Sequence, residues 1–180
     1  MPFQENSLKM IVDTESWVNN HPLSYQEKTN HNQDKAPKTL LRLVVDGAPV
    51  PQPRFRVNYK TRALYNPEKK QLQDLRNCLK GMVGARSLPI FGRSCFLRVS
   101  IDFYFKRPRS HFVKNGQELA KNAPKYPAGG DVDNFLKFVL DAGNNILYHD
   151  DSQVKILSGS LQYCINNEGP SSFDCHVSNI

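Results

Sequence analysis

The chain has 180 residues, of which 39% are hydrophobic and 10% aromatic, and its net charge is +7. This length and composition predict one globular domain with a core of its own. No apolar run approaches the roughly 20 residues that a membrane-spanning helix needs, and the N-terminus lacks the apolar segment of a signal peptide, so we expect neither a membrane protein nor a secreted one.

The first 36 residues predict a tail outside the domain. They are rich in Asn, Gln and Glu, with little periodicity apart from a short apolar patch around Met10 and Trp17, and they hold three basic and five acidic residues. Such a segment is typical of a disordered or loosely docked tail. We therefore place the domain at residues 37–180.

The domain opens with a short strand and a basic segment. Residues 39–47 (TLLRLVVDG) are rich in Leu and Val and end in Asp-Gly, which predicts a strand followed by a turn. In residues 48–67, prolines exclude a regular central strand, and basic residues alternate with Phe55, Tyr59 and Tyr65. This interleaving suits contacts with phosphates and bases of nucleic acid. A surface loop whose aromatic residues anchor it to the core fits the pattern equally well.

A helix and a long strand follow. Asn66 and Pro67 form a good helix start, and five apolar residues then recur at helical spacing up to Gly84: Leu72, Leu75, Leu79, Met82 and Val83. This predicts a core-facing helix with a basic outer face. In residues 95–108 apolar side chains alternate strictly with more polar ones, which predicts a long strand with one buried face.

Basic charge is concentrated in residues 37–130, which contain 19 basic and five acidic residues. A polyanion such as nucleic acid is therefore a candidate partner, although solubility alone explains such a charge equally well. The block ends in a basic loop at residues 107–130. A loop of this length in a compact domain is usually functional or disordered.

The next helix has acidic residues at both ends. On a helical projection, residues 133–147 separate into an apolar face and a polar face, on which Asp133, Lys137 and Asp141 form a line at i, i+4 and i+8. Asp131 lies just before this helix. A single aspartate there is explained by capping of the helix, but two aspartates one residue apart exceed what capping needs.

The second acidic pair, Asp150 and Asp151, comes after the helix and directly before a strand. An Asp-Asp-Ser turn in solvent explains it without any function. The chain could also return this pair to the start of the helix if the following strand lay beside the middle of the sheet. Two late strands are predicted: SQVKIL continuing toward LQYCI with a phase break in the alternation near Gly159, and FDCHVS.

Carboxylates brought together require protons or metal ions to neutralise their repulsion. Aspartate oxygens suit Mg²⁺ or Mn²⁺ with open positions for water and phosphate, so acids beside a basic surface predict phosphodiester chemistry. Lys137, one turn after Asp133, would orient or deprotonate the attacking water or stabilise the pentacovalent phosphate, unless it only pairs with Asp133 and Asp141. Asp141 lies about 12 Å along the helix from Asp133, so we expect it to have a supporting role at most.

The four cysteines, Cys78, Cys95, Cys164 and Cys175, include no C-x-x-C pair. This argues against a zinc ribbon and against a dense disulfide framework. We therefore expect reduced, mostly buried thiols in an intracellular protein.

The stretch DVDNFLKFVLDAGNNILYHDDSQV closely resembles the signature of the RusA family of Holliday junction resolvases. The shared features are D-x-D-N, a lysine four residues after the second Asp, an Asp on the same helix, and an Asp-Asp pair before a strand. GAPVPQPRFR, YNPEKK and FYFKRPRSHF also resemble that family, so the likeness covers residues 39–165. The sequence departs from the family pattern in two places. Gly129 and Gly130 replace basic residues or proline found in some members, which would weaken binding to a junction. AGNN replaces a more usual Leu-Asn-Gly at the end of the helix.

The resemblance implies a RusA-like α+β fold, with a small mixed β-sheet packed against two main helices, that forms a homodimer. It implies that Asp131, Asp133 and Asp151 bind the metal and, with Lys137, are catalytic. Asn134, Asp150 and Asp141 would support them. The implied cofactor is Mg²⁺, with Mn²⁺ as an alternative. The expected DNA-binding residues are Arg54, Arg56, Lys60, Arg62, Lys69, Lys70, Lys106, Arg107 and Arg109.

The function implied by the resemblance is that of a crossover junction endodeoxyribonuclease, a phosphodiester hydrolase. Such an enzyme would resolve four-way DNA junctions by paired symmetrical nicks in recombination and repair, and would be intracellular, with the DNA. A dimer suits this task because an almost two-fold symmetric junction needs two active sites. Two alternatives stay open: a module that binds branched DNA without cutting it, and a less selective nuclease for flaps or single strands.

Overall fold

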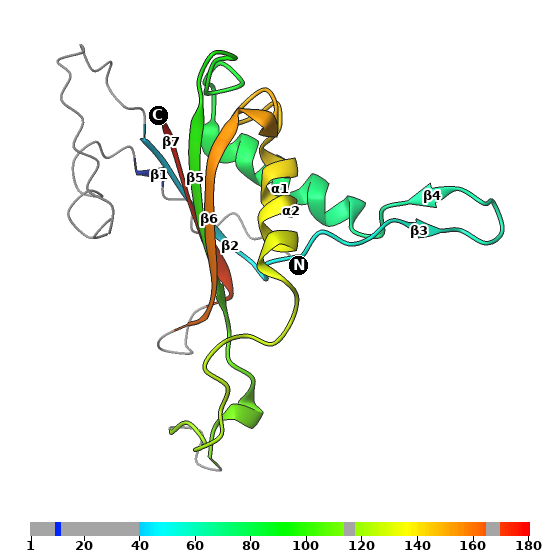
Figure 1. The fold of residues 1–180 in the computed structure, drawn as a ribbon, viewed down its shortest axis with the longest axis vertical. Coiled ribbons are helices and arrows are strands. Elements are labelled where there is room, and N and C mark those ends of the chain that lie inside the picture. Colours follow the sequence, from blue (N-terminus) through cyan, green and yellow to red (C-terminus); the bar gives the residue numbers. More distant parts are fainter. Residues whose placement is uncertain (1–9, 12–39, 114–117, 165–169) are drawn as a thin grey trace.

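The computed structural model describes residues 10–11, 40–113, 118–164 and 170–180. Apart from residues 10 and 11, which form a short strand of the sheet, the predicted tail at residues 1–36 lies outside the described residues. In the described part, a mixed five-stranded sheet carries two helices on one face (Figure 1). The predicted α+β fold with two main helices is therefore confirmed.

The strands are β1 (Met10–Ile11), β2 (Leu40–Asp46), β3 (Arg56–Val57), β4 (Leu64–Tyr65), β5 (Leu97–Phe105), β6 (Val154–Tyr163) and β7 (Ser172–Asn179). The helices are α1 (Lys69–Val83) and α2 (Val132–Gly143), with short 3₁₀ helices η2 (Arg109–His111) and η3 (Asp151–Gln153). The order across the sheet is β1-β2-β7-β5-β6. Only the β5–β6 pair is parallel; the other pairs of this sheet are antiparallel.

The core lies between the sheet and the two helices. On β5, the side chains of Leu97, Val99, Ile101 and Phe103 are buried and alternate with partly exposed neighbours, as predicted. The buried face of α1 includes Leu75 and Leu79, and α2 contributes residues such as Phe135 and Phe138 to the same cluster. The helical and strand periodicities of the sequence thus correspond to a single shared core.

Two predicted boundaries are wrong, both for local reasons. The first helix begins at Lys69 rather than Pro67, because the side chain of Asn66 accepts a hydrogen bond from the Glu68 N–H (2.9 Å) and forms a turn before the helix. The second helix ends at Gly143, four residues early. There the Tyr148 hydroxyl donates to the carbonyl of Leu140 (2.9 Å), and a Cβ on Gly143 would lie 2.6 Å from that hydroxyl.

The strand β6 runs from Val154 to Tyr163, as predicted, but its phase break is not near Gly159. The break lies at the start of the strand, where the register shifts between the partners of Leu97 and Arg98. Gly159 instead allows α2 to approach the strand closely, since a Cβ there would lie 2.7 Å from Cδ2 of Leu136.

Strands β5 and β6 are joined by a long loop and by α2, so α2 runs in the opposite direction to both strands (Figure 1). β6 lies at the edge of the sheet, not beside its middle. The chain therefore enters β6 at the C-terminal end of α2. Asp150 and Asp151 could return to the start of α2 only if β6 lay beside the middle of the sheet, and it does not.

All four cysteines are free thiols, as predicted, but only Cys175 is fully buried and the other three are half-buried. Burial raises the pKa of the Cys175 thiol to about 12. Of the helices in the described residues, none has the length and apolar character needed to cross a membrane.

Candidate active site

The D-x-D aspartates lie at the N-terminal end of α2. Asp131 occupies the N-cap position with an extended backbone, and its carboxylate makes no capping hydrogen bond. Asp133 lies in the first helical turn, and both side chains are exposed. Capping therefore does not account for Asp131. Two carboxylates one residue apart point to solvent at the positive end of a helix dipole, which favours negative charge.

The backbone on either side fixes this end of α2. Gly130 has a φ of 86°, and a Cβ there would lie 2.9 Å from the Phe135 ring, so glycine is the residue that fits this position. The Gln52 N–H donates to the carbonyl of Asn134 (2.8 Å) and anchors the proline-rich segment against the helix start. One apparent departure from the family pattern, Gly130, is thus required by the local packing.

Asp141 lies near Lys137, Asp151 and Arg76. The pKa of the Asp141 carboxyl is raised, mainly because the group is partly buried. The positive charges of Lys137 and Arg76 oppose this increase, and the negative charge of Asp151 adds to it. The Arg76 guanidinium also donates to the carbonyls of Asp141 (3.1 Å) and Asn144 (2.9 Å), which caps the C-terminal end of α2. Asp151 is therefore a neighbour of Asp141, at the opposite end of α2 from the D-x-D.

The turn that presents Asp151 is held by its neighbours. The Asp150 carboxylate accepts from the Ser152 N–H (3.0 Å). Hydrogen bonding to the Ser152 side chain and then to its backbone lowers the Asp150 pKa. Asp150 and Gln153 together form a capping box. Gln153 is buried and donates to the carbonyls of Gly92 (2.8 Å) and Cys95 (3.0 Å). Asp150 therefore stabilises the turn, which is the role expected of it if the acidic pair has no catalytic function. The Asp151 side chain is partly exposed.

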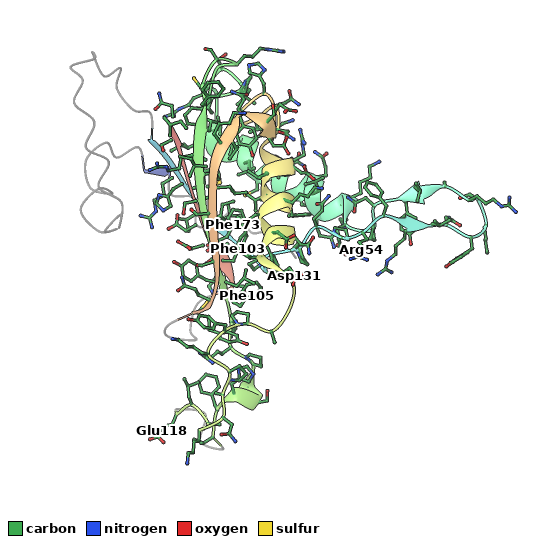
Figure 2. All side chains as sticks on the ribbon, in the orientation of Figure 1. Arg54, Phe103, Phe105, Glu118, Asp131 and Phe173 are labelled. Carbon is green, nitrogen blue, oxygen red and sulfur yellow. The ribbon has the colours of Figure 1, made fainter. Side chains whose placement is uncertain are left out.

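One chain does not bring the three expected metal ligands together. Asp131 is at one end of α2, and η3, which begins with Asp151, is at the other (Figures 1 and 2). A helix of 12 residues is about 18 Å long. Within the described ranges, no group of three or more His, Cys, Asp or Glu side chains is arranged to hold a metal ion. Asp131 and Asp133 suit two positions of such a site, and Asp151 does not complete it within the same chain.

The expected DNA-binding residues fall into two projections. The first, here called the hairpin projection, is formed by residues 54–70, which include β3, β4 and the start of α1. It carries Arg54, Arg56, Lys60, Arg62, Lys69 and Lys70. The second, here called the loop projection, starts after β5 and carries Lys106, Arg107 and Arg109. All are exposed except Arg107, which lies 4.1 Å from the Tyr163 ring centroid. The N-terminal end of α2 lies at the corner between the two projections (Figure 2).

The hairpin projection has aromatic side chains in solvent. Tyr59 is 95% exposed and Phe55 64%, so of the two alternatives for this segment, the one in which its aromatic residues anchor it to the core does not hold for these two. Asn58 shapes the tip: its side chain accepts from the Lys60 N–H (3.0 Å) and its carbonyl accepts from the Arg62 N–H (2.7 Å). An open hollow of about 650 Å³ is lined by Arg56, Val57, Asn58, Tyr59, Lys60 and Tyr65.

Comparison with protein-family models matches residues 46–167 to the family described as Endodeoxyribonuclease RusA. The match covers more than half of the chain and includes β3, β4, α1, β5, α2 and β6. This chain belongs to the RusA family. Membership supports a nuclease of the class that resolves Holliday junctions, and RusA nucleases generally depend on divalent metal ions. A comparison with curated proteins found no match.

Proposed function

We propose that this RusA-family chain is a Mg²⁺-dependent endodeoxyribonuclease that resolves four-way DNA junctions by paired nicks during recombination and repair, inside the cell. The observation that carries this proposal is the position of Asp131 and Asp133. Their exposed carboxylates lie at the corner between two basic projections. Such a corner attracts the phosphate backbone through the projections and holds acids that suit a hard cation.

Each part of the corner has a proposed task. Asp131 and Asp133 would hold the divalent ion, which supplies charge neutralisation and water activation when bound. Lys137 is exposed one turn along α2 from Asp133, where its ammonium group would pair with a phosphate oxygen. The lysines and arginines of the projections would fix the position of the DNA backbone without reading its sequence.

The shape of the chain favours branched DNA. The hairpin and loop projections leave the body in different directions (Figure 1). A straight duplex would follow one of them, whereas two arms of a junction can follow both while the branch point lies near the D-x-D. Selectivity for junctions would thus come from shape and backbone contacts.

The test is cleavage of a labelled four-way junction, a linear duplex and a flap with Mg²⁺ or EDTA. The wild-type chain should nick the junction in symmetrical pairs only with Mg²⁺, and Asp133→Asn should bind the junction but not cut it. Asp74→Asn, which removes one carboxylate from α1, should cut like the wild type. Binding without nicks in any metal would favour a non-cleaving module, and equal cleavage of flaps would favour a less selective nuclease.

A further inference from the structure

The hollow in the hairpin projection is lined by none of the aspartates of the proposed metal site. We infer that this hollow binds one unpaired nucleotide of the DNA, whose base stacks on tyrosine rings while basic side chains hold the flanking phosphates. This inference rests on the proposed function, because it names the part of a branched substrate that the hairpin recognises. It adds a binding activity for single-stranded DNA that requires neither a metal ion nor the D-x-D aspartates.

Aromatic rings and positive charges line the hollow together. Tyr59 and Tyr65 are 95% and 45% exposed, so neither ring is buried in the core. Arg56 and Lys60 contribute exposed cationic side chains. The described residues that line the hollow include no carboxylate. Rings beside cations fit a ligand that combines a planar apolar surface with negative charge, which is the chemistry of a nucleotide.

The hollow has room for a nucleotide, and its walls are ordered. Its volume of about 650 Å³ lies within the range of about 300–1,000 Å³ that is typical of small-molecule sites. Arg56 on β3 lies opposite Tyr65 on β4, so their side chains share one face of the hairpin. Beyond this pair, the Asn58 N–H donates to the carbonyl of Ala63 (2.9 Å). Because these bonds order the tip before binding, little conformational freedom is lost when a ligand binds there.

The side chains of the hollow favour an unpaired base over a duplex. Both faces of a base inside a duplex are covered by its neighbours, so a tyrosine ring can stack on a base only where the stack is interrupted. A four-way junction interrupts the stack at its branch point. A hairpin that enters the major groove of a duplex instead reads base edges with polar side chains. Tyr59, which is 95% exposed at the tip, offers chiefly the two faces of its ring and therefore suits the first contact.

The root of the hairpin places the hollow within reach of the D-x-D. The hairpin leaves the body beside the start of α2, where the Gln52 N–H donates to the carbonyl of Asn134 (2.8 Å) (Figure 1). Val57, which lines the hollow, follows Gln52 by five residues, so the two lie at most about 18 Å apart. One DNA strand advances about 3.4 Å per nucleotide, so this distance corresponds to about five nucleotides. A base at the branch point can therefore occupy the hollow while a nearby phosphate of the same strand lies at the D-x-D.

The test measures binding in EDTA, so that no cutting takes place. By fluorescence anisotropy, a short oligothymidine is compared with an abasic strand of the same length, which has the same phosphates but no bases. The wild-type chain should bind the oligothymidine about tenfold more tightly, because of base stacking on an aromatic side chain. Tyr59→Leu and Tyr65→Leu should each reduce this ratio, and the double variant should bring it close to one. Lys60→Ala should weaken the binding of both strands equally and keep the ratio.

Matched variants separate stacking from folding. Tyr59→Phe keeps the ring and should keep the ratio, whereas Tyr59→Leu keeps apolar bulk without a planar face. Phe96→Ala removes a 55% exposed ring outside the hairpin and should leave the ratio unchanged. Equal binding of both strands by the wild type, or an unchanged ratio in the Tyr59→Leu/Tyr65→Leu variant, would overturn the nucleotide site. So would a loss of affinity for linear duplex in Tyr59→Leu with no base dependence of single-strand binding, which would assign the hairpin to a groove.

A modified junction connects this site with the substrate and separates it from the nuclease function. A junction with abasic residues at its branch point should bind the wild type about tenfold more weakly than an intact junction, and the double variant should bind the two equally. A chain that nicks junctions but shows no base dependence overturns the nucleotide site and leaves the nuclease function standing. A chain that shows the base dependence but cuts no DNA supports the nucleotide site and overturns the nuclease function.

Discussion

Gln153 is a buried residue, 8% exposed, whose side-chain amide joins its own turn to the turn at residues 92–95. Its oxygen accepts from the His149 N–H (2.8 Å), and its nitrogen donates to the carbonyls of Gly92 and Cys95. Gln153→Leu keeps the approximate volume but removes the hydrogen bonds to the His149 N–H and the Cys95 carbonyl, while the Gly92 carbonyl still accepts from the Cys95 N–H (3.1 Å). Because each buried unsatisfied group costs about 1–3 kcal/mol, the free energy of unfolding should fall by about 3 kcal/mol in urea denaturation.

The control for this prediction is Gln73→Leu on α1. Gln73 is exposed and bonds Asn77 one turn along the helix (2.9 Å), a pair that contributes about 0.5 kcal/mol or less. A Gln153→Leu protein as stable as the Gln73→Leu protein would show that the contact between these two turns does not depend on the amide.

The two adjacent glycines before α2 should differ in their tolerance of alanine. Gly130 combines a φ of 86° with a close approach to Phe135, whereas a Cβ on Gly129 meets no atom within 4 Å. Gly130→Ala should lower the free energy of unfolding by about 1–2 kcal/mol, because the left-handed region disfavours a Cβ. It should also shift Asp131 and slow junction nicking, while Gly129→Ala should do neither. Equal nicking rates for the two variants would contradict this.

At the scale of elements, the hairpin of β3 and β4 should bind DNA through its tip. Its aromatic residue Tyr59 is 95% exposed, on a turn ordered by Asn58. Because base stacking contributes about 1–3 kcal/mol per base, Tyr59→Ala should weaken junction binding about tenfold in fluorescence anisotropy, with no loss of thermal stability. Phe96→Ala removes a 55% exposed ring just before β5 and should bind like the wild type. A similar loss in both variants would argue against a specific role of the tip.

The sequence predicted elements well where the signal is local. The alternation of β5 and the helical spacing of α1 record burial within one segment, and the D-x-D-N with Lys137 needed only short spacings. The end of α2 was missed because Tyr148 folds back on Gly143, a contact that hydrophobic periodicity does not record. Arg76 and Gln153 were missed because the carbonyls they bond lie 58 to 68 residues away along the chain. The separation of Asp151 from Asp131 depends on strand order, which no local pattern contains.

At the scale of the whole molecule, both projections should bind one DNA junction at once, and salt dependence can test this. Removing one basic side chain that binds a phosphate should reduce the slope of log K against log salt by about 0.9. Arg56→Ala in the hairpin projection and Arg109→Ala in the loop projection should each lower the slope by that amount, and the double variant by about twice as much. These effects should be independent, because the two residues lie on separate projections. Arg93→Ala, which removes an exposed charge from the turn before β5, should leave the slope unchanged. If Arg109→Ala also left it unchanged, the junction would bind the hairpin projection alone, and the selectivity for branched DNA could not come from two diverging basic arms.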